Sequence, residues 1–292
     1  MFNRIRKLLF VVTTTVIFIS CSKNERENVI VVSVEPQRAL LEEIVDDKFK
    51  VVSVLSAGAN PETFEPGMQM RRNLDNAQAY MITGYLPFEK KLAESIDDDV
   101  IIVDTSEGIE PVYGTHVHLH NHSHDCHHHH EHGEADPHTW TSVKNAKRIV
   151  ANMYESVVKI DPLNQDYYTA RYIRLTERLD SLDNAMTARL DTAVASHTFA
   201  IWHPSLSYFA RDYGLEQLSV GFENKEMAAS ALHDMIIKAK ENGVKVFFFQ
   251  KEFDSRQAET LNNEMGTTLV TINPLDYDWE QQIERIVSAL CQ

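Results

Sequence analysis

The sequence predicts an α/β protein of two lobes, each built on a mainly parallel sheet, joined by one long rigid helix. Short runs rich in β-branched residues alternate with helix-like segments in both halves of the chain. This alternation is typical of parallel sheets covered by helices on both faces. Between the halves, apolar residues recur at helical spacing over about thirty residues. With 292 residues and 43% hydrophobic composition, the chain is long enough for two cores.

The first residues are typical of an export signal. Three basic residues within the first seven precede an uncharged stretch over residues 8–20, which ends directly before Cys21. We expect residues 1–20 to be a signal peptide, because this apolar run is too short to cross a bilayer of about 30 Å with its flanks. The residues up to Cys21 resemble a bacterial lipobox. This resemblance implies that Cys21 carries a lipid and that residues 21–28 form a tether.

The first lobe is expected over residues 29–160. Helix-like segments at Leu40–Asp47 and Phe88–Ile96 separate its strands, and a further helix includes Val143 and Met153. The apolar, β-branched runs predict four strands, at Val29–Val34, Phe49–Leu55, Ala79–Thr83 and Val100–Val103.

One amphipathic helix is predicted over residues 161–194. About thirty residues at 1.5 Å each give a rod of roughly 45 Å, which is long enough to run past both lobes. A coiled coil with a partner chain is the alternative, because the spacing alone does not say what covers the stripe. The apolar stripe consists of Tyr168, Tyr172, Leu175, Leu179, Leu182 and Met186.

The second lobe is expected over residues 195–292. Ser205 is a candidate N-cap for a helix around Ala210, with Gly214 as its stop. Further helical patterns cover Met227–Lys240 and Arg256–Glu264. The predicted strands are Thr198–Trp202, Leu218–Val220, Val244–Phe249 and Thr267–Ile272.

Residues 114–135 differ from the rest of the chain in composition, since they hold ten of its fourteen histidines. A tract this polar cannot form a core, so we expect a surface loop. Imidazole suits zinc, copper or nickel, and histidines two apart on a flexible strand can chelate weakly. The weak sites are His116, His118, His120, His122, His124, His127, His128, His129, His130 and His132.

A selective site needs a defined shape and is expected elsewhere. Open α/β sheets bind ligands beyond the carboxyl ends of their strands. His203 follows a predicted strand, and His138 follows the histidine-rich loop. Glu62 follows another strand, and Asn273 with the nearby Asp276 follows the last one. We expect these side chains to converge on one cleft, where the metal site is predicted.

The net charge and the cysteine content narrow the kinds of partner and of covalent framework that the sequence allows. A net charge of −15 disfavours nucleic acid and anionic headgroups as partners and suits a protein that handles cations. Apart from Cys21, only two cysteines remain, so no disulfide framework is expected.

Several motifs from about Ile30 to the C-terminus are specific when taken jointly. They are the strand Val31–Val34 with Leu40–Ile44, the turn Pro61–Pro66, Asp136–Trp140, His203–Pro204 with Tyr208–Leu215, Gly243–Gln250 and Asn273–Leu275. With these motifs the chain resembles the zinc and manganese solute-binding proteins of ABC importers. The resemblance implies two α/β lobes, one rigid linking helix and a metal ion between the lobes.

The resemblance also implies a ligand set. His138 and His203 fall on two of the family's ligand positions, whereas Glu62 stands where histidine is usual and Asn273 where aspartate is common. Two histidines and one carboxylate can hold Zn²⁺. The harder carboxylate also makes Mn²⁺ or Fe²⁺ an alternative.

The function implied is high-affinity capture of a divalent metal, above all zinc, and its delivery to an ABC importer permease. We expect a monomer that is not an enzyme, anchored by lipid to the membrane and facing the periplasm or the cell exterior. Two alternatives stay open, namely a metal buffer or metal-dependent adhesin without an importer, and a zinc-dependent hydrolase. The sequence holds no His-Glu-x-x-His motif, which disfavours the hydrolase.

Overall fold

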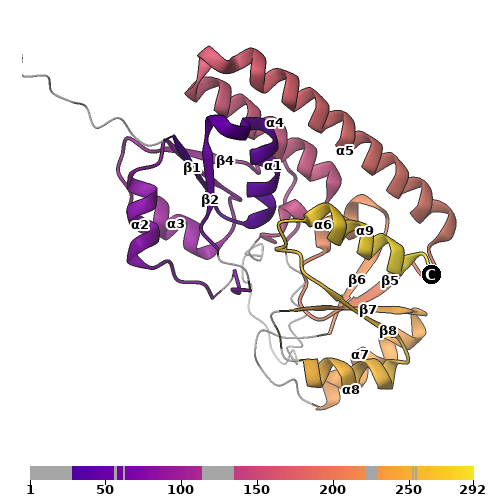
Figure 1. Ribbon diagram of the computed structural model, residues 1–292. Helices are drawn as coiled ribbons and strands as arrows, with labels where there is room; N and C mark the ends of the chain where they lie inside the picture. Colours follow the sequence, from indigo (N-terminus) through magenta and orange to yellow (C-terminus); the bar gives the residue numbers. More distant parts are fainter. Residues whose placement is uncertain are drawn as a thin grey trace, which may run out of the picture.

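The computed structural model describes residues 28–55, 58–61, 63–113, 135–220, 229–251, 253 and 255–292, with the side chains of 229–231 and 255 excepted. The predicted fold is confirmed, since two four-stranded parallel sheets lie on either side of a long helix in the sequence. Figure 1 shows this helix, α5, running along one side of the molecule past both sheets.

The first sheet has the strand order β2-β1-β3-β4 and only parallel pairs. Its central strand β1 is apolar on both faces and fully buried, as expected when helices cover both sides of a sheet. All four strands lie where the sequence predicts them. They are β1 (Val29–Val32), β2 (Lys50–Ser53), β3 (Ala79–Ile82) and β4 (Ile101–Asp104).

The helices of the first lobe begin at local signals in the sequence. Pro36 and Pro87 stand in the first turns of α1 and α3, where a missing N–H costs no hydrogen bond. Ser142 caps α4 by accepting a hydrogen bond from the backbone N–H of Asn145. The helices are α1 (Glu35–Val45), α2 (Met68–Asp75), α3 (Pro87–Ala93) and α4 (Val143–Ile160), with short 3-10 turns at Asp46–Lys48 and Thr139–Thr141.

The long helix α5 spans Gln165–Ala193, after a 3-10 turn at Pro162–Asn164. Of its predicted stripe, Tyr168, Leu175, Leu179 and Met186 are buried. They lie against α1 and α4 of the first lobe and α9 of the second. The stripe is therefore covered within the chain, which disfavours the coiled-coil alternative.

The second sheet repeats the first, with the order β6-β5-β7-β8 and only parallel pairs. The strands are β5 (Thr198–Ile201), β6 (Glu216–Ser219), β7 (Val246–Gln250) and β8 (Thr268–Ile272). The helices are α6 (Ser207–Asp212), α7 (Ala229–Glu241), α8 (Ser255–Met265) and α9 (Trp279–Leu290).

The predicted N-cap of α6 was wrong. Leu206 occupies the cap position, and the Ser205 hydroxyl instead accepts a hydrogen bond from the side chain of Gln250, over 2.8 Å. The predicted stop is in place, because Gly214 follows the helix with a φ of 67°, a conformation that glycine adopts without strain.

Among the residues that the structure describes, the buried apolar side chains form two clusters. The larger is continuous across the lobes and includes Val31 of β1, Leu179 of α5 and Phe248 of β7. The smaller, with Phe247 and Ala258, lies on the outer face of the second sheet under α7 and α8. In the described chain no helix is both long enough and apolar enough to cross a membrane.

Candidate metal site

His138 lies in the first lobe, directly before the 3-10 turn that leads into α4. Its imidazole Nδ1 is 2.8 Å from Oδ1 of Asp136, which also accepts the backbone N–H of His138 over 2.8 Å. Both side chains are buried. A carboxylate at Nδ1 fixes the tautomer and the orientation of the ring and makes Nε2 a stronger electron-pair donor, the arrangement common for histidine ligands of metals.

Asp136 is held as a carboxylate at neutral pH. Burial alone would raise its pKa, but the His138 imidazole and the hydrogen bonds from His138 and Ser207 outweigh burial, so the pKa lies below its usual value. The main-chain oxygen of Asp136 accepts a hydrogen bond from the Tyr208 hydroxyl, over 2.8 Å. The first residues of α6 in the second lobe therefore help to fix the residue that orients His138.

His203 lies in the second lobe, two residues beyond the end of β5. Its backbone N–H donates to Oε1 of Gln250 over 3.1 Å, and its carbonyl accepts from Nε2 of the same side chain over 2.6 Å. The imidazole packs against Phe253, with 5.6 Å between ring centroids. His203 is only 8% exposed, so its ring is confined by the protein.

The two histidines meet at the junction of the lobes. Their ring centroids are 5.2 Å apart, with 70° between the ring planes. A zinc ion about 2.0–2.1 Å from one nitrogen of each ring, with a tetrahedral angle between the two bonds, places the centroids roughly 5 Å apart. The observed distance is thus suited to one shared ion.

The other predicted ligands fall in two groups. Glu62 lies outside the described residues. Asn273 and Asp276 lie in the turn after β8, where Nδ2 of Asn273 donates to Oδ2 of Asp276 over 3.1 Å. Across the described ranges, no group of three or more His, Cys, Asp or Glu side chains is arranged as a metal centre. Of the predicted ligands that the structure describes, His138 and His203 lie close to each other, and Asn273 is hydrogen-bonded to Asp276.

The ten loop histidines and Cys21 also lie outside the described residues. Their roles stay predictions.

Two supporting residues, Asp136 and Gln250, were not assigned a role from the sequence. The sequence nevertheless offers one indication for each residue. An aspartate two residues before a candidate histidine ligand is close enough to bond to its ring, and a glutamine ends the otherwise apolar strand β7. Neither signal says which atom the side chain contacts.

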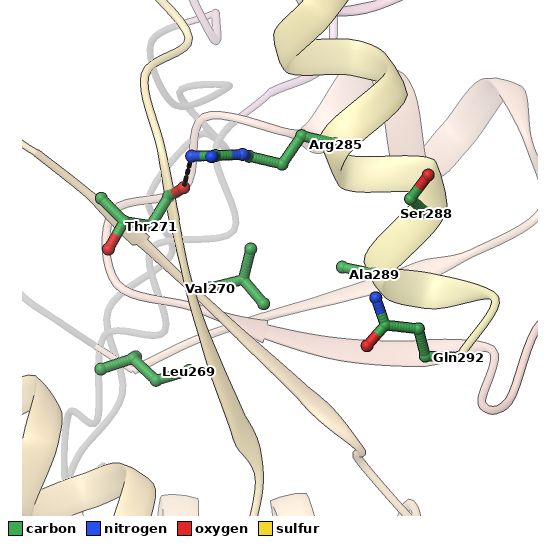
Figure 2. Close-up of a pocket in the computed structure, with 7 residues that line it drawn as sticks. All are labelled: Leu269, Val270, Thr271, Arg285, Ser288, Ala289 and Gln292. Atoms are coloured by element: carbon green, nitrogen blue, oxygen red, sulfur yellow. Dashed lines mark hydrogen bonds between the residues drawn. The ribbon is translucent and has the colours of Figure 1, made fainter.

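A hollow elsewhere in the second lobe does not suit a cation. Figure 2 shows it between β8 and α9, lined by Leu269, Val270 and Ala289 among others, with the Arg285 guanidinium donating to the carbonyl of Thr271 over 2.9 Å. The side chains that line it include no imidazole, thiolate or carboxylate. The Arg285 charge would repel a metal ion, so the histidine pair is the better candidate.

Comparisons with known proteins show which family the chain resembles. A family model described as "Zinc-uptake complex component A periplasmic" matches residues 30–289. The high-affinity zinc uptake system protein ZnuA of Bacillus subtilis (strain 168) is 30% identical over 263 residues, which cover 87% of this chain and 80% of that protein. The zinc-binding lipoprotein AdcA of Streptococcus pneumoniae (strain ATCC BAA-255 / R6) is 24% identical over 286 residues, which cover 92% of this chain but only 55% of AdcA.

Solved structures share the fold of this chain. A ZnuA deletion mutant with zinc bound has a TM-score of 0.78 and 28% identity, covering 90% of this chain and 98% of its own. FpvC of Pseudomonas aeruginosa in complex with Mn²⁺ has a TM-score of 0.75 and 23% identity, covering 91% of this chain and 97% of its own, a likeness of fold alone.

Proposed function

The chain belongs to the family of the periplasmic component A of the zinc-uptake complex, and we propose that it captures one divalent metal ion, zinc, and delivers it to an ABC importer permease. The observation that carries this proposal is the 5.2 Å separation of the His138 and His203 rings, one from each lobe. One ion held by both imidazoles would link the two halves of the molecule.

We propose Glu62 as the third ligand, in a site of two imidazoles and one carboxylate. Asn273 or Asp276 would complete the coordination if their mutual hydrogen bond opens, and water is the simpler fourth ligand. Zn²⁺ is favoured by the imidazole pair and by the relatives that are named for zinc, while the carboxylate keeps Mn²⁺ and Fe²⁺ as alternatives.

The histidine-rich loop is proposed to bind metal weakly at several positions and to raise its local concentration near the site. The chain is proposed to act as a monomer without a catalytic step, since its family consists of binding components of a transporter. Cys21 is proposed to carry a lipid that keeps the protein at the outer side of the membrane, as the name of the lipoprotein AdcA supports.

Zinc titration of a loop-deleted protein tests the proposal. Deleting residues 114–135 should remove the weak sites and leave one tight zinc per chain. Binding only to the folded state adds RT ln(1 + [L]/Kd), or about 4 kcal/mol at a thousandfold excess over Kd, so zinc should raise the melting temperature by several degrees. His138→Ala or His203→Ala in this background should abolish most of that rise.

His197→Ala is the matched control, because His197 lies six residues before His203 but has an exposed side chain. It should bind zinc like the loop-deleted parent. If the loop-deleted protein shows no tight site, the functional metal belongs to the loop and the proposed function is wrong. Equal zinc affinity in all three histidine variants would move the site away from the lobe junction.

A further inference from the structure

One buried amide contacts both main-chain polar groups of His203. Gln250 ends β7, and its side chain is completely buried. Its Oε1 accepts the His203 N–H over 3.1 Å, and its Nε2 donates to the His203 carbonyl over 2.6 Å and to Oγ of Ser205 over 2.8 Å. One side chain thus contributes three hydrogen bonds to a single turn of the chain.

The turn that carries His203 has no regular secondary structure. It connects β5, which ends at Ile201, with α6, which begins at Ser207. Strand pairing fixes the backbone up to Trp202, whose N–H donates to the carbonyl of Phe248. Beyond Trp202 the strand pairing ends, so hydrogen bonds from side chains must fix the conformation of the turn.

Gln250 is suited to fix this turn because its own backbone is held by strand pairing. It pairs with Ile272 of β8, and β7 lies between β5 and β8 in the sheet. The amide therefore couples the rigid interior of the second sheet to the backbone of His203. The His203 imidazole then contacts the rings of both His138 and Phe253, at centroid distances of 5.2 and 5.6 Å.

We propose that Gln250 is a positioning residue for metal capture, which fixes the His203 backbone so that its imidazole faces His138. This inference rests on the proposed function. Both polar atoms of the Gln250 amide are bonded to the His203 backbone, which assigns the side chain a positioning role rather than a ligand's role. The role needs an amide, since the His203 N–H requires an acceptor and the His203 carbonyl requires a donor.

Two substitutions test which atoms of the Gln250 amide are needed. Gln250→Met keeps the length of the side chain and removes both polar atoms. Gln250→Glu keeps the acceptor but places a second oxygen against the His203 carbonyl, where a donor stood. In the loop-deleted protein each variant should weaken zinc binding about 10- to 100-fold, the usual cost of losing an outer residue that orients a ligand.

Gln217→Met is the matched control. In β6, the Gln217 amide accepts the Leu206 N–H over 2.8 Å and donates to Oγ of Ser207 over 2.9 Å, so it bonds to the same connection three residues beyond His203. Its loss should lower the melting temperature of the metal-free protein, as Gln250→Met does, while the Kd for zinc stays within about twofold of the parent.

The experiment measures zinc Kd by chelator competition at 25 °C and records the visible absorption of the Co²⁺-loaded proteins, which reports the geometry around the ion. We expect a weaker Kd and an altered Co²⁺ spectrum in both Gln250 variants and neither change in Gln217→Met. Parent-like Kd and spectrum in either Gln250 variant would overturn the positioning role. So would failure of both variants to fold, because the amide would then serve folding itself. Absence of a tight zinc site in the loop-deleted parent would overturn the proposed function and this inference together.

Discussion

Trp140 of the first lobe donates a hydrogen bond from its indole Nε1 to the main-chain carbonyl of Pro274 in the second, over 2.8 Å. Both residues are buried. Trp140 lies two residues after His138, and Pro274 directly follows Asn273. The bond therefore joins the segment of one candidate ligand to the segment of another across the lobe junction.

Trp140→Phe should destabilise the metal-free protein by about 1–3 kcal/mol, because the buried carbonyl of Pro274 loses this donor. Urea denaturation followed by circular dichroism measures the change. Trp202→Phe is a control for the loss of indole volume, since Trp202 is only half-buried. An unchanged midpoint in Trp140→Phe would mean that the bond adds nothing to the joining of the lobes.

Asp136→Asn should weaken zinc binding about 10- to 100-fold. The amide can still meet Nδ1 of His138, but it lacks the charge that strengthens the imidazole as an electron donor. Zinc Kd by chelator competition is the measurement. Asp212→Asn is the matched control, because this carboxylate also lies at the junction but accepts from Ser142 rather than from a histidine. Equal affinities in the two variants would leave Asp136 with a purely structural role.

Much of the fold could be predicted because its signals are local and repeated. Each predicted strand is a short β-branched or aromatic run, and all eight exist in the structure. Two helices, α2 and α9, were not predicted. The eight residues of α2 include only one buried side chain, Leu74, so its sequence carries little helical periodicity.

The site was predictable only in part, for a physical reason. His203 could be predicted to lie at the site because it follows a strand, and ligands of open α/β sheets bind beyond the carboxyl ends of the strands. His138 follows the histidine-rich loop rather than a strand, and it was predicted from that position and from the family resemblance. The contacts of Asp136 and Gln250 depend on rotamers and on the exact path of two turns, which residue types do not encode. The same holds for Asn273 and Asp276, whose mutual hydrogen bond is a property of their turn.

Tyr277→Phe tests whether the Tyr277 hydroxyl, in the segment before α9, stabilises the protein by its hydrogen bond to α1. The Tyr277 hydroxyl donates to Oε2 of Glu42 over 2.6 Å, and the Arg38 guanidinium lies 4.4 Å from the ring centroid. The hydrogen bond to Glu42, together with burial, raises the pKa of Tyr277 to about 12. Because the folded pKa lies above the ordinary value near 10, this contribution to stability is present below about pH 10 and is lost as pH rises through about 12.

Melting temperatures of the parent and Tyr277→Phe should therefore differ by a constant few degrees from pH 7 to about pH 9 and approach each other above about pH 10. A difference that does not change across this range would show that the phenol acts through packing alone.

Cys21→Ala should release the protein from membranes or leave its first residues uncleaved, because the proposed lipid has no other attachment point. Membrane fractionation and the mass of the mature chain measure this. Cys291→Ala is the control, since this thiol lies at the end of the second lobe. Membrane association and mass identical to the parent in Cys21→Ala would show that the chain carries no lipid at this cysteine.

Glu62→Gln should weaken zinc binding strongly in the loop-deleted protein, because an amide keeps the shape of the side chain but loses the charge that makes a carboxylate a good cation ligand. Glu62→His should keep or strengthen zinc binding relative to manganese, since imidazole is the softer donor. Titration of each variant with Zn²⁺ and with Mn²⁺ measures both effects.

Glu65→Gln is the matched control for Glu62. Glu65 lies three residues further along the sequence, but its side chain is 84% exposed and pairs with Lys91 over 3.4 Å. Removing its charge should leave the zinc Kd nearly unchanged, because an exposed carboxylate is well screened by water and salt. If Glu62→Gln behaves like Glu65→Gln, Glu62 is not a ligand. The ion would then be held by His138 and His203 with Asn273, Asp276 or water, and the preference for zinc over manganese would rest on the two imidazoles.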